Sequence, residues 1–538
     1  MYNEALNATS DERFKNMSRR FTREYADSNN GEYHGSQLKF DLPSISTEQG
    51  FLSLRESSIS FPYVINVSST VNLAAMKDRM VTLKCGSQGL ISGCSIQMDN
   101  QTIKSINGDF ENIPLTYKII SSASTDDEQN LFDSIKFAMD DTDIAYQVGA
   151  GETNGVVLKP VPGIGDTVET NAHNEGLVKR LRRTSFNPAN AQTAKFTNVD
   201  RTIARRKDHI VNTDAKTITY HMIVTMPLTF LTYDLFDKFG LTKGLFMKLN
   251  VNIHSGSTSF NVAHAAGKAI TNQAPVTRFG TCPFQLTNCS QSWDTTADTV
   301  ITISSGIVKA GGFSNDFGMN ASSFNAVFYG MRPEAEAEYL SIVPKQHIRY
   351  TQLYVASLNA VSANASFTAK VSNSTSKMRW LLIHTSLSSA VNGGANATDV
   401  GGGVCSTMNS PFSSSPTTCM KHASLTNLQI LVGGKPLYET PKSYTYQMFL
   451  EEIRGANSIN GGLQLGLSSG LLDQRMWEEG YGYIFIDLSR YETDNEDLVS
   501  KPLEVRATNN TLNVCDYQFY LGTEAEFTLN TASGKIEM

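Results

Sequence analysis

A short segment near the end of the sequence has the pattern of a catalytic serine. Residues 466–470 read G-x-S-x-G, the nucleophile elbow of serine hydrolases, and Asp487 in YGYIFIDLSR (481–490) is the obvious acid of a triad. In that fold the histidine follows the serine and the acid along the chain. The last of the nine histidines is His422, which precedes Ser468, so this order is impossible.

A triad in another chain order remains open, because His384 or His422 could serve as the base. The surrounding GGLQLGLSSGLLDQ, however, is rich in Gly and Ser and lacks the strand-then-helix pattern of a nucleophile elbow. We therefore interpret it as a flexible loop. A carbohydrate-cleaving site would need two facing carboxylates, and Glu478 with Asp487 is the pair to test.

Metal and phosphate motifs are equally weak. Cys405, Cys419 and His422 have a spacing that fits no common zinc module. The GGK of LVGGKPLYE lacks the first glycine of a phosphate-binding loop, and its two glycines suit a hairpin turn instead. We predict no catalytic residue, no metal ligand and no cofactor.

Period-two alternation gives YGYIFIDLSR a structural interpretation. Tyr481, Tyr483 and Phe485 face one way and Ile484 and Ile486 the other, so both faces are apolar. We expect a strand covered on both sides. Asp487 and Arg490, at its end, are predicted to cap the strand or pair there, including in a contact between subunits.

Two basic clusters are candidates for binding partners. The first, within the N-terminal 45 residues, contains Arg13, Lys15, Arg19, Arg20 and Arg23 with no acid among them. Aromatic and apolar residues at offsets 0, 3, 7 and 11 would make it a basic amphipathic helix, able to lie on anionic lipid, nucleic acid or a neighbouring subunit. A partly disordered arm with solubilising charge is equally compatible.

The second cluster is the segment KRLRR at 179–183. Its charges, Lys179, Arg180, Arg182 and Arg183, suit pairing with acids on another copy, and a solvated loop is equally plausible.

Composition limits the class of protein. A chain of 538 residues predicts two or more domains, and 18% charged residues suits a protein that hides much surface against other copies. The net charge of -7 argues against general nucleic-acid affinity. Seven cysteines without a C-x-x-C pair indicate a reducing compartment, and the N-terminus lacks a secretory signal pattern, so we expect synthesis inside a cell.

Short alternating segments recur along the chain and predict an all-β protein. They are 58–67, 80–85, 94–98, 217–226, 245–254, 348–358, 378–386, 428–432, 481–489, 503–508 and 514–521. Helical patterns are few, at 232–240, 333–340 and 445–455. Residues 385–424 form a low-complexity stretch that should be a long exposed loop.

Two internal echoes suggest two copies of one β fold. Residues 94–113 and 428–453 share an apolar strand, a two-residue turn, a short return strand and an aromatic segment. Residues 242–257 and 479–492 share a glycine, an aromatic-rich strand and a polar turn.

The order of several motifs resembles the double-jelly-roll major capsid proteins. These are PLTFLTYDLFDKFGLTKGLFMKLNVNIH, VFYGMRPEAEAEYLSIVPKQHIRYTQLYVAS, LVGGKPLYETPKSYTYQMFLEEI, YGYIFIDLSR and KPLEVRATN. The sequence is most similar to the hexon-like proteins of adintoviruses and polinton-like viruses, with virophage and adenovirus-type capsid proteins more distant. The resemblance covers about residues 45–538, and 258–300 matches no recognised segment.

The resemblance implies two tandem eight-stranded jelly rolls with a few short helices in loops. The implied organisation is an N-terminal arm (1–45), a first jelly roll (46–332), a linker helix (333–344) and a second jelly roll (345–538). It further implies a homotrimer with a pseudo-hexagonal outline that tiles an icosahedral virion shell beside neighbouring capsomers, penton and minor capsid proteins. The arm would meet genome DNA, an internal membrane or another capsomer. The alternative is a carbohydrate-binding or carbohydrate-cleaving β-sandwich.

Overall fold

The computed structural model describes most of the strands and leaves out several long connections. The described residues are 17–28, 36–69, 79–84, 86–124, 126–129, 135, 137–139, 176, 210–213, 217–262, 270–273, 283–288, 299–307, 321–388, 424–459, 469–489 and 499–537. The predictions for Arg13, Lys15, Lys179, Arg180, Arg182, Arg183, Arg490, Ser468 and nearly all of the low-complexity stretch fall outside them.

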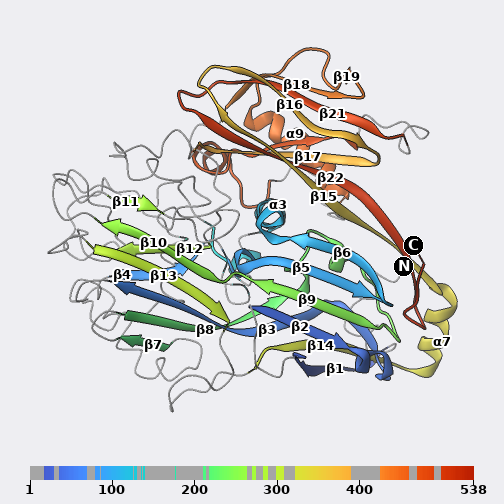
Figure 1. Cartoon of the computed structure of the whole chain (residues 1–538). Helices are drawn as coiled ribbons and strands as arrows, with labels where there is room; N and C mark the ends of the chain where they lie inside the picture. Colours follow the sequence, from blue (N-terminus) through green and yellow to red (C-terminus); the bar gives the residue numbers. More distant parts are fainter. Residues whose placement is uncertain are drawn as a thin grey trace.

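The C-terminal half, here called the second unit, is a sandwich of two antiparallel sheets (Figure 1). One sheet has the order β15 (Lys345–Val361), β22 (Cys515–Asn530), β17 (Met378–Leu387) and β20 (Ile484–Asp487), with β23 (Ile536–Glu537) beside β22. The other has the order β16 (Ser366–Thr375), β21 (Lys501–Asn509), β18 (Leu425–Val432) and β19 (Lys435–Pro436). Sheet partners far apart in sequence are the mark of a jelly roll.

The N-terminal half, the first unit, repeats this topology. One sheet has the order β2 (Gln37–Leu42), β9 (Met247–Ile253), β5 (Ile91–Met98) and β6 (Gln101–Asn107). In the other, β1 (Met17–Ala26) pairs with β14 (Ser323–Met331), β14 with β3 (Phe51–Ser69), and β3 with β8 (Thr217–Pro227). Eight strands of the first unit occupy the same sheet positions as the eight strands of the second unit other than β23. In chain order, β1, β2, β3, β5, β6, β8, β9 and β14 correspond to β15, β16, β17, β18, β19, β20, β21 and β22. The chain therefore contains two jelly rolls, as the resemblance drawn from the sequence motifs implied.

Additional strands enlarge the first unit. The long strand β3 also pairs with β13 (Thr299–Ile307), which continues into β10 (Gly256–Val262) and β11 (Ile270–Gln273). A further strand, β7 (Ile210–Thr213), pairs with β8, and β12 (Phe284–Asn288) pairs with β4 (Arg79–Leu83). The segment 258–300, which matched no recognised pattern, thus contributes strands between β9 and β14 that have no counterpart among the described strands of the second unit.

The first internal echo is confirmed. In both units an apolar strand (β5 or β18), a two-residue turn and a short return strand (β6 or β19) precede a helix, α3 (Gly108–Ser122) or α9 (Tyr446–Ile459). Asp99 and Asn100 have φ of 47° and 61°, and Gly433 and Gly434 have φ of 60° and 82°, the left-handed conformations that a tight hairpin turn needs. The second echo is wrong, because its two segments are not equivalent. The strand in 242–257 is β9, whose counterpart in the second unit is β21, whereas the strand in 479–492 is β20, whose counterpart in the first unit is β8.

Helix α7 (Pro333–Ile342) connects the units and confirms the predicted helix there, as α9 does for residues 445–455. A further short helix, α10 (Gln474–Glu479), precedes β20. The expected helix at 232–240 is only the 3-10 turn Leu235–Lys238. Other 3-10 turns are Pro43–Thr47, Ser87–Leu90 and Leu228–Phe230.

The segment expected to be an arm contains two strands of the first unit. β1 pairs with β14, and β2 pairs with β9, so the described part of this segment is already sheet from Met17 onward. The helical interpretation of the basic stretch is therefore wrong for its described part, Met17–Ala26. The spacing of Phe21 and Tyr25 also fits a period of two, and pairing with β14 decides between the two periods.

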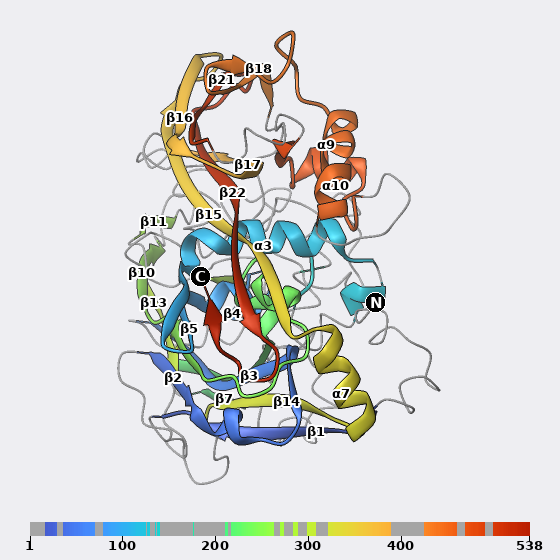
Figure 2. The ribbon, with the colours of Figure 1, turned by 90° about the vertical axis from the view of Figure 1, so that its right-hand side faces the viewer.

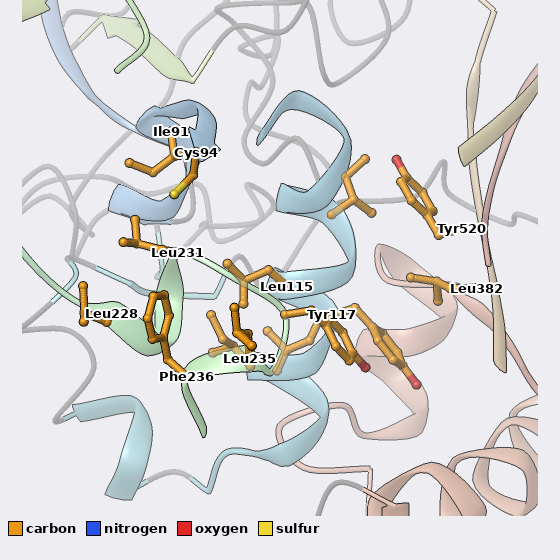
Figure 3. Close-up of a cluster of buried hydrophobic side chains, with 14 of the residues drawn as sticks. Ile91, Cys94, Leu115, Tyr117, Leu228, Leu231, Leu235, Phe236, Leu382 and Tyr520 are labelled. Atoms are coloured by element: carbon orange, nitrogen blue, oxygen red, sulfur yellow. The ribbon is translucent and has the colours of Figure 1, made fainter. Parts of the chain in front are cut away.

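One apolar core extends through both units, because α3 lies between them (Figures 2 and 3). In Figure 3, Leu115 and Tyr117 of α3 lie between Leu235 of the first unit and Leu382 of the second, and all four are almost completely buried. Core residues of this type contribute about 1.5–3 kcal/mol each on burial. The shared core makes the two jelly rolls one packed body.

Candidate functional site

The contact between the two units, here called the seam, contains a buried polar network. The carboxylate of Asp234, in the turn before Leu235, accepts hydrogen bonds from the backbone N–H and the hydroxyl of Thr351, both at 2.8 Å. Thr351 lies in β15, and its carbonyl accepts a hydrogen bond of 3.1 Å from Lys104 Nζ of β6. The first strand of the second unit is thereby held by two charged groups of the first.

Lys104 also forms an ion pair with Glu111 of α3 at 3.2 Å, with the two side chains only 4% and 12% exposed. Burial raises the pKa of Glu111, while the adjacent Lys104 opposes that rise and Asp234 adds to it. Burial also raises the pKa of the Cys94 thiol to about 12, with a smaller contribution from Glu111. Removing one member of such a network is costly because the remaining charge stays buried and unpaired.

Aromatic rings fill the rest of the seam. Tyr117 of α3 stacks on Phe485 of β20 with centroids 5.5 Å apart, and its ring meets Tyr483 edge-on at 5.2 Å. Tyr233 lies 5.0 Å from Trp380 of β17. The sequence prediction that YGYIFIDLSR is covered on both faces is confirmed, since Tyr483, Ile484, Phe485 and Ile486 are all buried.

The second half of the G-x-S-x-G segment belongs to the seam. Ser469 hydrogen-bonds with Tyr446 and with the carbonyl of Leu472. The N–H of Leu471 donates to the carbonyl of Ile120 at the end of α3, at 2.8 Å. A Cβ on Gly470 would lie 2.4 Å from the backbone carbon of Ser121, so only glycine permits this approach. These contacts give the segment a packing role.

Asp487 caps the end of β20, as the sequence analysis predicted. Its side chain accepts hydrogen bonds from the N–H of Ser489 at 3.0 Å and from its hydroxyl at 2.6 Å. Its backbone N–H donates to Glu452 of α9 at 2.9 Å, and Tyr438 donates to the other oxygen of that carboxylate at 3.2 Å. Whether Asp487 also contacts another subunit stays a prediction.

Sequence reasoning missed the buried charges of the molecule. Glu452 is only 3% exposed, although it lies on the same helical face as Phe449 and Ile453. An acid on the apolar face of a predicted helix was the available signal. Asp234 and Lys104 gave no local signal, because their shared partner Thr351 lies on a strand more than a hundred residues away in sequence.

The proposed carboxylate pair has separate local partners. Glu478 is exposed on α10 and accepts a hydrogen bond of 2.8 Å from Gln474, one helical turn away. Asp487 is engaged with Ser489. Nothing in these contacts favours carbohydrate cleavage.

The described part of the first basic cluster is an edge strand with exposed arginines. Arg19 and Arg23 lie over the ring of Phe21, at 4.7 and 5.6 Å from its centroid, and Phe21 stacks on Phe328 of β14 at 5.4 Å. Arg20 projects to the other face and pairs with Glu56 at 2.9 Å. The cation–π stack holds two positive charges at the surface of the first unit.

Across the described ranges no helix is long and apolar enough to cross a membrane. In the same part of the chain, His, Cys, Asp and Glu side chains form no group of three or more that could hold a metal ion.

The two sheets of each unit, their matching order and the shared core define the class: the chain has the double-jelly-roll fold. No family model and no curated protein matches the sequence. A chain from the cryo-EM structure of the Sputnik virophage is similar over 97% of this chain and 88% of that chain, with 11% identity and a TM-score of 0.55.

Other solved structures are also similar in part. The mavirus major capsid protein matches over 99% of this chain and 93% of its own, at 12% identity and a TM-score of 0.42. The Faustovirus major capsid protein matches over 94% and 90%, at 8% identity and a TM-score of 0.42. At 11% identity, the similarity to the Sputnik chain shows a shared fold, and the double-jelly-roll fold expected from the sequence motifs is confirmed.

Proposed function

We propose that this chain is a major capsid protein, which forms homotrimers of pseudo-hexagonal outline and assembles them into an icosahedral virion shell. The observation that supports this best is the seam. Two jelly rolls of the same topology form one packed body through α3 and the network of Asp234, Thr351 and Lys104. Three such bodies around a threefold axis present six similar sandwiches, which is the geometry that hexagonal tiling needs.

The proposal includes the partners that such a shell requires. These are neighbouring capsomers, penton and minor capsid proteins, and genome DNA or an internal membrane reached by the N-terminal segment that includes Arg13 and Lys15. In this function the protein has no catalytic activity. The protein assembles by burying surface between its copies, first within the trimer and then through weaker contacts between trimers.

The experiment is to purify the chain, measure its mass by sedimentation and image it by electron microscopy. We expect about three chain masses and hexagonal particles, and closed shells at higher concentration. A stable monomer at micromolar concentration, or a hydrolytic activity lost on replacing Glu478 and Asp487, would contradict the proposal.

A further inference from the structure

One end of the first unit has a composite surface made by β1, β14 and α7. Met17 of β1 pairs with Met331 of β14, and Arg332 alone separates Met331 from the first residue of α7. The start of the basic strand therefore lies next to the start of the connecting helix. Figures 1 and 2 both show β1 and α7 along this end of the molecule. We call it the terminal surface.

The helix side of the terminal surface is acidic. Glu334 and Glu338 are exposed on α7, and no ion pair is recorded for either of them within the described ranges. Glu336 differs, because it pairs with Lys243 at 2.7 Å. Two carboxylates are thus available to a partner.

The strand side of the terminal surface is basic. Arg19 is exposed and has no acid partner among the described residues, while Arg23, with 58% of its side chain exposed, is 3.5 Å from Glu48. Both are held over Phe21, so they are already oriented before any partner binds. A preoriented side chain loses less entropy on binding.

Apolar side chains lie between the acidic helix and the basic strand. Met17 and Met331 from the strands and Leu340 and Val343 near the end of α7 are half-buried around Phe51, Leu241 and Tyr339. Ile342 is 52% exposed beside them. An apolar centre with charges at its margin is the composition of a protein interface.

The strand β1 lies at the edge of its sheet among the described strands. Among the described strands β1 pairs only with β14, and charged residues on such an edge disfavour unspecific pairing with other chains. The arginines therefore select for a partner that supplies acids at fixed positions.

We propose that the terminal surface binds the terminal surface of a second copy of this chain across a twofold axis. A twofold contact places the same patch of each copy against the other, so every contact between a residue of one copy and a residue of the other occurs twice. Arg19 and Arg23 of each copy then face Glu334 and Glu338 of the other, and the apolar centres meet. This contact rests on the proposed capsid function, in which it joins neighbouring capsomers.

A charge-exchange experiment tests the proposal on the full chain. The variant R19E/R23E and the variant E334K/E338K should each raise the protein concentration needed for shell assembly by about tenfold, because like charges then face each other at four places. The quadruple variant exchanges the signs and should return to within about threefold of wild type. The control E451K reverses an exposed charge on α9 and should leave assembly unchanged.

Sedimentation of each variant shows whether trimers remain intact, which separates this proposal from the function on which it rests. If the wild-type chain forms neither trimers nor shells, the capsid function fails. If wild-type shells form and both double variants assemble like wild type, or the quadruple variant assembles no better than they do, the twofold contact is refuted and the capsid function stands.

A cross-link provides a second readout that does not depend on assembly yield. Separately purified R19C and E338C chains are mixed and oxidised, so any disulfide between positions 19 and 338 must join two copies. Mass spectrometry should detect that linked peptide pair in the mixture. Its absence from shells assembled from the mixed chains would overturn the proposal.

Discussion

The carboxylate of Asp234 accepts two hydrogen bonds of 2.8 Å from Thr351, one from its backbone N–H and one from its hydroxyl. The two residues belong to different jelly rolls, and both are at least 91% buried. This pair fixes the first strand of the second unit against the first unit, and it makes the seam a defined geometry.

Replacing Asp234 by alanine should destabilise the chain by about 2–4 kcal/mol, because the buried N–H and hydroxyl of Thr351 lose their acceptor. Urea unfolding at fixed protein concentration measures the change. T351V removes only the hydroxyl bond and should cost about 1 kcal/mol. D41A, at an exposed acid 3.9 Å from Lys248, is the control, and an equal loss in D234A and D41A would contradict the argument.

Replacing Gly470 by alanine should destabilise the chain by more than about 2 kcal/mol. The new Cβ would lie 2.4 Å from the backbone carbon of Ser121, and backbone cannot move aside as a flexible side chain can. The control is G434A, where φ is +82° but nothing lies within 4 Å, so only the left-handed conformation costs energy, about 1 kcal/mol. Thermal unfolding that ranks G434A as the more damaging change would refute this explanation.

The Glu111 carboxyl should make the chain less stable as pH rises. Burial raises its pKa above the ordinary value of 4.5, so the folded state binds the proton more tightly than the unfolded state does. Its contribution is therefore complete at low pH and is lost as pH rises from about 4.5 through the raised pKa. The difference in unfolding free energy between wild type and E111Q should fall over this window, whereas a constant difference would show that Glu111 does not titrate there.

Cys94 should resist alkylation in the folded protein. Its thiol is buried, and a pKa of about 12 leaves almost no thiolate at pH 8. Iodoacetamide labelling followed by peptide mapping should find Cys94 unmodified before unfolding in urea and modified afterwards. Cys515 is buried too and its pKa is also raised, so it should behave alike. Rapid labelling of either residue in the folded state would indicate local opening.

Much of the fold was predictable because its strands have local signals. The eleven segments chosen from alternation all contain or overlap a strand of the structure, and α7 and α9 were indicated by a proline at the first helical position and by an apolar stripe. The turns Asp99–Asn100 and Gly433–Gly434 were visible for the same reason, since few residues accept positive φ.

The helix α3 was missed because of where it lies. It is buried on nearly every side between the two units, so it lacks the polar face that gives a surface helix its period, and Pro114 lies inside it. The basic strand β1 was interpreted as a helix for the opposite reason. Much of it is exposed, so no burial pattern identifies its period, and pairing with β14 determines its conformation.

The sequence by itself determined the location of eleven strand segments, that the β architecture occurs twice, and that no serine triad in hydrolase order is possible. Tertiary structure alone decided which strands pair, that Asp234, Thr351, Lys104 and Glu111 meet in one seam, and that a basic strand lies beside an acidic helix. The physical reason is the distance along the chain between the residues that interact. Alternation and turn preferences act between neighbours in the chain, whereas the buried Asp234 and Lys104 both bind Thr351, which folding brings from more than a hundred residues away.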